Sequence, residues 1–191
     1  MKKILITWHY LLPLKKEYKD ILRKHNISYD VKSINPSLKE RDLLKIIHKY
    51  DGIICGDDEI TKKVIKKAKK LKVISKWGTG LNSIDLNFAK KNKIKVFNSP
   101  KAFVESVSVY TFGILINLTR GLIKINREVL QNNWPKYSGV ELKGKKMGII
   151  GFGNIGTRIA KLAKAFEMKV LVNDTNKRLK KKNRKSKIFI C

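Results

Sequence analysis

The amino-acid sequence predicts an α/β protein built on two parallel β-sheets. Three observations support this prediction. Short Ile- and Val-rich runs alternate with amphipathic helical stretches over the first hundred residues, Pro100 interrupts that alternation, and a strand, a glycine-rich turn, a helix and another strand follow from Met147. Strands that are each followed by a helix are typical of parallel sheets with helices on both faces. At 191 residues and 42% apolar composition, the chain is long enough for one large domain or two small ones.

The first part of the chain is expected to hold five strands and the helices that connect them. The strands are expected at residues 3–8, 27–33, 51–56, 71–76 and 94–98. Helices are expected at about 14–22, 37–50, 60–71 and 84–91, with Ser37 opening the second. The third helix has the clearest apolar stripe, formed by Ile60, Val64, Ile65, Ala68 and Leu71. Ligands of such sheets bind beyond the carboxyl ends of the strands.

A domain boundary is expected near Asn98 to Pro100. It gives a first domain over residues 1–98, a second over 99–174 that begins with a long helix from about Ala102 into the 120s, and a basic tail over 175–191. The segment from Ala102 to Leu118 is strongly apolar, but polar residues interrupt it and it is shorter than the ~20 residues that span a bilayer. We therefore expect a helix buried on most sides and no membrane partner.

The strongest local motif is a glycine-rich turn between two predicted strands. Gly151, Gly153 and Gly156 form G-x-G-x-x-G after an apolar strand and ahead of an amphipathic helix, and Asp174 ends the next strand. The three glycines allow a tight turn, close approach of the backbone to a pyrophosphate, and close packing of helix on strand. Because the whole context is present, we favour a dinucleotide site over chance glycines. Asp174 favours NAD, whereas Lys177 and Arg178 leave NADP as an alternative.

A second candidate site is the segment KWGTGLNSID at the end of the fourth predicted strand. Gly78 and Gly80 flank Thr79, so that backbone N–H groups can face an anion such as a carboxylate. A purely structural turn at the strand exit explains these residues equally well.

The chain resembles the D-isomer-specific 2-hydroxyacid dehydrogenases over residues 1–174. The segments that carry the resemblance are LKVISKWGTGLNSIDLNFAKKNKIKVFNSPKAF from Leu71, LTR from Leu118, Trp134, and ELKGKKMGIIGFGNIGTRIAKLAKAFEMKVLVND from Glu141. The resemblance implies a flavodoxin-like substrate domain followed by an incomplete Rossmann cofactor domain. It also implies NAD-dependent hydride transfer between NAD(H) and a small 2-hydroxy or 2-keto acid, and a homodimer when the protein is full length.

The resemblance also implies which residues bind the substrate and the cofactor. The substrate carboxylate is expected to be bound by Gly78, Thr79 and Gly80, with Thr79 also at the nicotinamide end of the cofactor. The rest of the cofactor is expected to be bound by Gly151, Gly153, Asn154, Ile155, Gly156 and Asp174. One departure lies on the connecting helix, where the family's acidic V-A-[ED] pattern is replaced by Val107, Ser108 and Val109.

No catalytic residue is predicted within this chain. The family's His, Glu and Arg fall after the point where this sequence ends, and His9, His25 and His48 do not match that His. Hydride exchange with a 2-hydroxy acid needs a proton-exchanging group and a cation for the carboxylate. We therefore expect a chain truncated at its C-terminus that has marginal stability and little or no turnover by itself.

The charge of the chain suggests a second class of function. The formal net charge is +29, from 37 Lys and 7 Arg against 15 acidic residues. Lysine on exposed helix faces favours a solvated surface over a specific polyanion site. The tail after Asp174 carries eight basic residues and no acidic one, which indicates either a disordered scar of a reading-frame slip or an arm that binds nucleic acid non-specifically. The alternative to the enzyme is thus a catalytically dead dinucleotide- or nucleic-acid-binding basic protein.

Cysteine usage and the N-terminus indicate a cytoplasmic protein. Cys55 and Cys191 are too few for a disulfide framework or a metal site, which favours a reducing compartment. The N-terminal apolar stretch is interrupted by Trp8, His9 and Tyr10 and lacks a cleavage site, so that it predicts a strand instead of a signal peptide.

Overall fold

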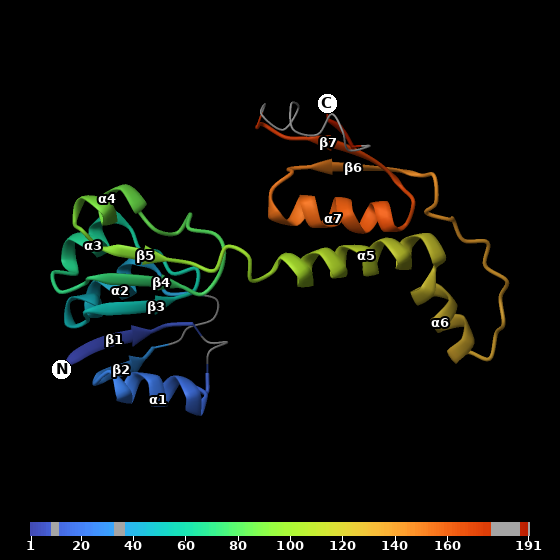
Figure 1. Ribbon diagram of the computed structural model, residues 1–191. Helices are drawn as coiled ribbons and strands as arrows, with labels where there is room; N and C mark the ends of the chain where they lie inside the picture. Colours follow the sequence, from blue (N-terminus) through green and yellow to red (C-terminus); the bar gives the residue numbers. More distant parts are fainter. Residues whose placement is uncertain (9–11, 33–36, 177–187, 191) are drawn as a thin grey trace. The chain divides into compact units, whose positions relative to one another are not determined.

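The computed structural model describes residues 1–8, 12–32, 37–176 and 188–190, and it contains two compact units. The first unit comprises Met1–Ala102 and the second Phe103–Cys191, so that the chain passes from one to the other just after Pro100 (Figure 1). Each unit is described by itself below.

The first unit is built on a five-stranded parallel sheet with the order β2-β1-β3-β4-β5. Its strands are β1 (Lys2–Ile6), β2 (Ile27–Val31), β3 (Gly52–Cys55), β4 (Val73–Lys76) and β5 (Lys95–Phe97). All five lie within the predicted strand positions or extend them by one residue. This order is that of flavodoxin-like sheets, and it confirms the predicted α/β class.

The second to fourth helices of the first unit are shorter than the sequence pattern predicts, whereas the first has the expected length and begins about two residues later. They are α1 (Lys16–Lys24), α2 (Glu40–Ile46), the 3₁₀ turn η2 (Ile47–Lys49), α3 (Lys62–Lys67) and α4 (Leu86–Lys91). The prediction that Ser37 opens the second helix is wrong. The Glu59 carboxylate accepts the Glu40 N–H at 3.0 Å, so that α2 begins at Glu40 and its first turn is satisfied from outside the helix.

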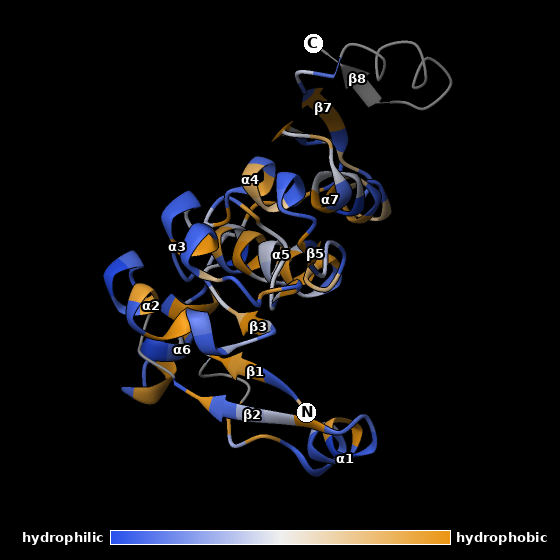
Figure 2. Cartoon of the chain, turned by 90° about the vertical axis from the view of Figure 1, so that its left-hand side faces the viewer, coloured by the Kyte–Doolittle hydropathy of each residue, from blue (hydrophilic) through white to orange (hydrophobic). Residues whose placement is uncertain are grey.

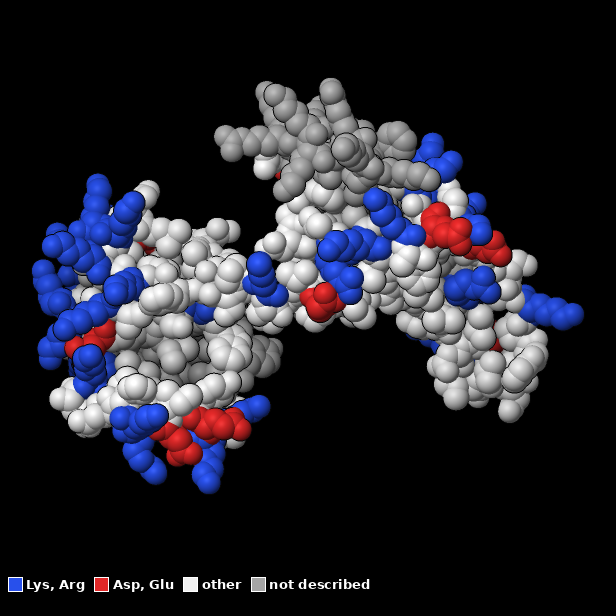
Figure 3. All heavy atoms as spheres, viewed as in Figure 1, with Lys and Arg blue, Asp and Glu red and all other residues white. Residues whose placement is uncertain are grey.

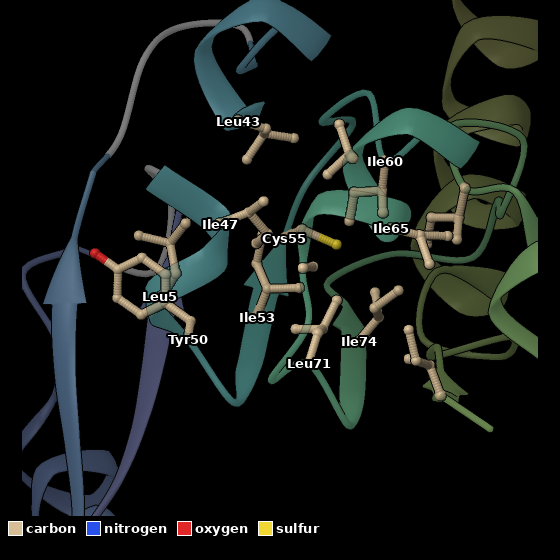
Figure 4. Close-up of a cluster of buried hydrophobic side chains, with 14 of the residues drawn as sticks. Leu5, Leu43, Ile47, Tyr50, Ile53, Cys55, Ile60, Ile65, Leu71 and Ile74 are labelled. Carbon is tan, nitrogen blue, oxygen red and sulfur yellow. The ribbon is translucent and has the colours of Figure 1, made fainter. Parts of the chain in front are cut away.

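Alternate residues of the strands face two different apolar layers. Leu5, Ile53 and Ile74 are buried on the face covered by α2, α3 and α4, where Figure 4 shows their side chains converging. Ile6 and Ile54 point to the opposite face, toward α1. The predicted stripe of the third helix, from Ile60 to Leu71, is buried in the first layer. Figure 2 shows β1 and β3 in the hydrophobic colour, as expected for central strands covered on both faces.

The second unit contains a three-stranded parallel sheet with the order β6-β7-β8. Its elements are α5 (Val104–Arg120), α6 (Leu122–Leu130), β6 (Lys146–Ile150), α7 (Asn154–Ala165), β7 (Lys169–Asn173) and β8 (Ile188–Ile190). The structure therefore differs in part from the expected disordered tail, because residues 188–190 form a strand that pairs with β7. Residues 177–187 and 191 lie outside the described part of the chain.

Helix α5 packs against α7 through one face only. Phe112 is buried and its ring stacks on that of Phe166 at a centroid distance of 5.2 Å. Val107, Tyr110 and Leu118 lie on another face and are exposed. The prediction of a helix buried on most sides is wrong, since Ser108 and Phe112 are its buried residues among those described.

Glycine ends the connecting helix. Gly121 has φ of 66° and separates α5 from α6, and a Cβ there would meet the Tyr137 ring at 2.6 Å. Among the described residues no single helix is long and apolar enough to cross a membrane. Helices α5 and α6 meet that criterion only when they are taken together, across a bend of 62°.

Ser108 is expected to destabilise the packing of α5 on α7. It is fully buried, and its hydroxyl has no hydrogen-bond partner among the described residues. A buried hydroxyl without a partner costs free energy that an alanine methyl group does not. We predict that Ser108→Ala raises the free energy of unfolding by up to about 1 kcal/mol, measured by urea denaturation followed by circular dichroism.

Ser106→Ala is the matched control on the same helix, because Ser106 is exposed. Its effect should stay within about 0.5 kcal/mol of zero. A clear loss of stability in Ser108→Ala would show that the hydroxyl has a stabilising partner after all.

Candidate functional site

The glycine-rich turn joins the end of β6 to the start of α7. Gly151 has φ of 90°, a left-handed conformation that a residue with a Cβ adopts only with strain. Gly153 is the N-cap residue of α7 and is exposed. The first backbone hydrogen bond of the helix runs from the Thr157 N–H to Gly153 O, at 2.9 Å. The N–H groups of Asn154 and Ile155 therefore point out of the exposed first turn, where an anion can accept them.

Gly156 is the point of closest approach between helix and strand. A Cβ at this position would lie 2.1 Å from the Gly151 carbonyl oxygen and 3.3 Å from the Ile149 side chain. At Gly153, by contrast, a Cβ would meet nothing within 4 Å. Gly156 thus serves the packing of α7, whereas the space above Gly153 stays open for a ligand.

Asp174 lies directly beside this turn. Its Oδ2 accepts the Phe152 N–H at 2.5 Å and its Oδ1 accepts the Asn176 N–H at 2.7 Å. The Gly151 N–H donates to Asn173 O at 2.8 Å, which holds the end of β7 against the end of β6. The turn and the acidic strand end are therefore brought together as predicted from their spacing.

Backbone amides keep the Asp174 carboxylate charged. The Phe152 N–H, and then the Asn176 N–H, lower its pKa below the ordinary value of 3.8, and desolvation opposes them only in part. The charge is therefore present above that value and is lost only as the pH falls through the lowered pKa. The alternative donors to a 2′-phosphate, Lys177 and Arg178, lie outside the described residues.

The second candidate site lies at the carboxyl end of β4 in the first unit. Gly78 has φ of 150°, and its carbonyl oxygen accepts the Ser99 N–H at 2.9 Å. Thr79 O accepts the side-chain amide of Asn98 at 2.7 Å. Thr79 and Gly80 are exposed. The loop is thus tied to the segment after β5 while its tip faces solvent.

Sequence reasoning missed a buried lysine next to this loop. The Lys76 side chain is 3% exposed, and its ammonium donates to Gly56 O and to Asp57 Oδ1, both at 2.5 Å. It joins the exits of β3 and β4, two residues before Gly78. The signal was available as the single lysine within the apolar strand VISK, at the position where the strand ends.

A buried carboxylate holds the same edge of the sheet together. Asp58 is 1% exposed and accepts from Thr7 Oγ1 at 2.6 Å, from Leu38 N at 2.7 Å and from Gly56 N at 2.9 Å. These three donors follow β1, precede α2 and follow β3. Asp58 therefore holds the loops of this edge together. Its role is structural, since it provides hydrogen-bond acceptors for buried donors.

The remaining reactive side chains of the first unit are poorly suited to catalysis. Burial raises the pKa of the Cys55 thiol to about 12, so that it stays protonated. The described residues contain no group of three His, Cys, Asp or Glu side chains that could hold a metal ion. His25 ends α1 and His48 lies in η2, and both precede strands, at the amino edge of the sheet.

The two glycines of the turn are predicted to differ in their effect on folding. Gly156→Ala places a methyl group against a backbone carbonyl that cannot move aside, and we expect a loss of about 2–4 kcal/mol in the free energy of unfolding. Gly153→Ala is the control and should change it by less than about 1 kcal/mol. Urea denaturation of the two variants measures the difference, and equal losses would contradict the assigned close approach.

The comparisons with known proteins agree with this geometry. The family model "D-isomer specific 2-hydroxyacid dehydrogenase, catalytic domain" matches residues 4–160. The D-3-phosphoglycerate dehydrogenase of Archaeoglobus fulgidus is 32% identical over 165 residues, which cover 85% of this chain and 31% of the relative. The hydroxypyruvate reductase of Thermotoga maritima is 34% identical over 168 residues, which cover 86% of this chain and 54% of the relative.

A solved structure with the same fold is the D-lactate dehydrogenase of Aquifex aeolicus, complexed with NAD and lactic acid. It has a TM-score of 0.77 and 27% identity, over 98% of this chain and 55% of that one. The chain thus spans between about a third and about half of the length of these relatives. Since the family model covers most of the chain, the resemblance is confirmed: the chain belongs to the family of D-isomer specific 2-hydroxyacid dehydrogenases.

Proposed function

We propose that this chain forms the N-terminal part of an NAD-dependent oxidoreductase that transfers hydride between NAD(H) and a small 2-hydroxy or 2-keto acid. The observation that carries the proposal is the Asp174 carboxylate, which two backbone amides hold beside the glycine-rich turn. Family membership supports the same reaction class, and the relatives described above act on acids of this kind by name.

The residues of the turn fit a dinucleotide. The open space above Gly153 admits a pyrophosphate, and the exposed first turn of α7 offers N–H groups from Asn154 and Ile155. Asp174 is a charged acceptor for the ribose hydroxyls and repels a 2′-phosphate. When bound, the nicotinamide supplies the hydride chemistry, whereas these residues bind and orient the cofactor.

The exposed tip of the 78–80 loop is proposed as part of the substrate carboxylate site. Two hydrogen bonds hold the loop, one from Ser99 N to Gly78 O and one from the Asn98 side chain to Thr79 O. Both use carbonyl oxygens of the loop, so that the amides of its tip can face a ligand. Thr79 is also proposed to lie at the nicotinamide end of the cofactor. The ion pair between Lys76 and Asp57 holds the strand end from which this loop begins.

We also propose that the full-length protein is a homodimer and works in the cytoplasm. Helix α5 presents a stripe of exposed apolar side chains with helical spacing, and α6 continues it with exposed apolar residues of its own. The residues of the stripe are Val107, Tyr110, Ile114 and Leu118, followed by Leu122 and Ile123. Such a stripe is suited to contact with a second copy. The cytoplasmic assignment rests on the presence of two cysteines in the chain, of which Cys55 is buried and forms no disulfide.

Cofactor binding provides the first test. We predict that NADH fluorescence rises on titration with the chain, and that Asp174→Ala weakens binding by about 10- to 100-fold because a charged acceptor is lost. Gly153→Ala should weaken binding as well, through its added methyl group in the pyrophosphate space. Glu167→Ala is the matched control, since Glu167 is an exposed acid of the same unit. Unchanged affinity in Asp174→Ala would contradict the assigned ribose contact.

Turnover provides the second test. Of the described histidines, His25 and His48 lie at the amino edge of the first sheet, the opposite end from the 78–80 loop. We therefore predict no measurable NADH-dependent reduction of hydroxypyruvate or glyoxylate by the 191-residue chain. Measurable reduction that Asp174→Ala abolishes would show that the chain carries its own acid–base group.

A further inference from the structure

The first unit carries a dense cluster of exposed lysines at the amino edge of its sheet, called here the amino-edge lysine patch. Its residues are Lys66, Lys67, Lys69, Lys70, Lys72, Lys90, Lys91, Lys93 and Lys95. They come from the C-terminal ends of α3 and α4, from the connections that lead from these helices to β4 and β5, and from the first residue of β5. Figure 3 shows lysine and arginine side chains gathered over the part of this unit where α3 and α4 lie.

The pairing of β4 with β5 brings the two connections together. The Lys95 N–H donates to Lys72 O at 2.9 Å, and Val73 lies opposite Lys95 in the parallel register. Helices α3 and α4 also lie side by side, with the Lys62 ammonium 5.6 Å from the centre of the Phe88 ring. Two lysine runs that are separate in sequence therefore form one surface, which the pattern of a single helix did not reveal.

The charges of the patch are not neutralised within the described residues. None of its nine lysines forms an ion pair there, whereas the neighbouring Lys63 is paired with Glu40 at 3.1 Å and is left out of the patch. Residues 61–84 and 86–104 contain no Asp or Glu. Asp85 caps the opposite, N-terminal end of α4, and the Asp51 carboxylate accepts the backbone N–H of Lys3.

Helix dipoles do not account for so many lysines. The C-termini of α3 and α4 lie in the patch, and basic residues in a last turn are favourable there. Each C-terminus is equivalent to roughly half a negative charge at most, so that two of them offset about one of the nine lysines. A surface that served solubility alone would mix both signs of charge.

We propose that the amino-edge lysine patch binds the phosphate backbone of a double-stranded nucleic acid without reading its sequence. Lysine supplies point charges for phosphates, and the patch offers no guanidinium fork for base edges. Phe88, the aromatic side chain of α4, is half-buried with the Lys62 ammonium over its ring, so that it is poorly placed to stack on single-stranded bases.

A duplex suits the patch better than a membrane surface does. The apolar residues of the two connections are turned inward, since Ala68, Leu71 and Ile94 are buried, so that no side chain of the patch is available to insert into lipid. The patch lies at the end of the sheet opposite the 78–80 loop. Nucleic-acid binding therefore does not depend on the proposed dehydrogenase site, and either can fail without the other.

The test compares two variants of equal charge. Lys66, Lys69, Lys70 and Lys91 are changed to Gln in the patch variant, and Lys15, Lys16, Lys19 and Lys24, at and within α1, are changed to Gln in the control. Each lowers the formal net charge of +29 by the same four units, and the basic tail is intact in both. The probe is a fluorescein-labelled DNA duplex of about 20 base pairs, and affinity is measured by anisotropy over a range of salt concentrations.

The patch variant is expected to bind the duplex at least about tenfold more weakly at low salt than the control variant does. Its slope of log affinity against log salt should be shallower by up to about 3–4, since each lost phosphate contact removes about 0.9. A third variant with Arg at the same four positions should retain binding, which separates loss of charge from loss of fold.

Three results would overturn the proposal. Equal weakening in the patch and control variants would mean that only net charge matters. Unchanged binding in the patch variant would place the contact elsewhere, including the basic tail. Binding to phosphatidylserine vesicles but not to the duplex would identify an anionic membrane as the partner instead.

Discussion

The second unit depends on the close approach of α7 to β6 at Gly156. No side chain fits between this position and the Gly151 carbonyl, so that the helix lies directly on the strand. The same contact sets the direction in which the first turn of α7 faces. It also leaves the Phe152 N–H free to reach Asp174 at the end of β7. One steric constraint thus positions both the proposed pyrophosphate site and the proposed ribose acceptor.

The first unit is organised by charges that point inward at the carboxyl edge of its sheet. Asp58 accepts from donors on three segments, and Lys76 joins the exits of β3 and β4. Buried charges are costly unless they are paired or hydrogen-bonded; Asp58 accepts three hydrogen bonds and Lys76 donates two. The proposed substrate loop begins two residues after Lys76, so that its shape depends on these polar contacts as well as on its glycines.

The charge of the chain is distributed unevenly between the two edges of the first sheet. The carboxyl edge carries Asp57 and Asp58 against Lys76, whereas the amino edge carries the amino-edge lysine patch, whose lysines form no ion pair within the described part of the chain. Because parallel strands place all their amino ends together, lysines that precede separate strands accumulate on one surface. The nine lysines of the patch therefore create a local positive field at one end of the unit.

Sequence by itself determined the order of strands and helices, the glycine-rich turn and its link to Asp174, because those features depend on local spacing and on the period of apolar residues. It mispredicted the burial of α5, since apolar content does not say how many neighbours a helix has. It also missed the Lys76 contact and the pairing of Lys72 with Lys95 that joins the two parts of the amino-edge lysine patch. These join residues from different strands, and only the parallel register of the folded sheet decides which of them meet.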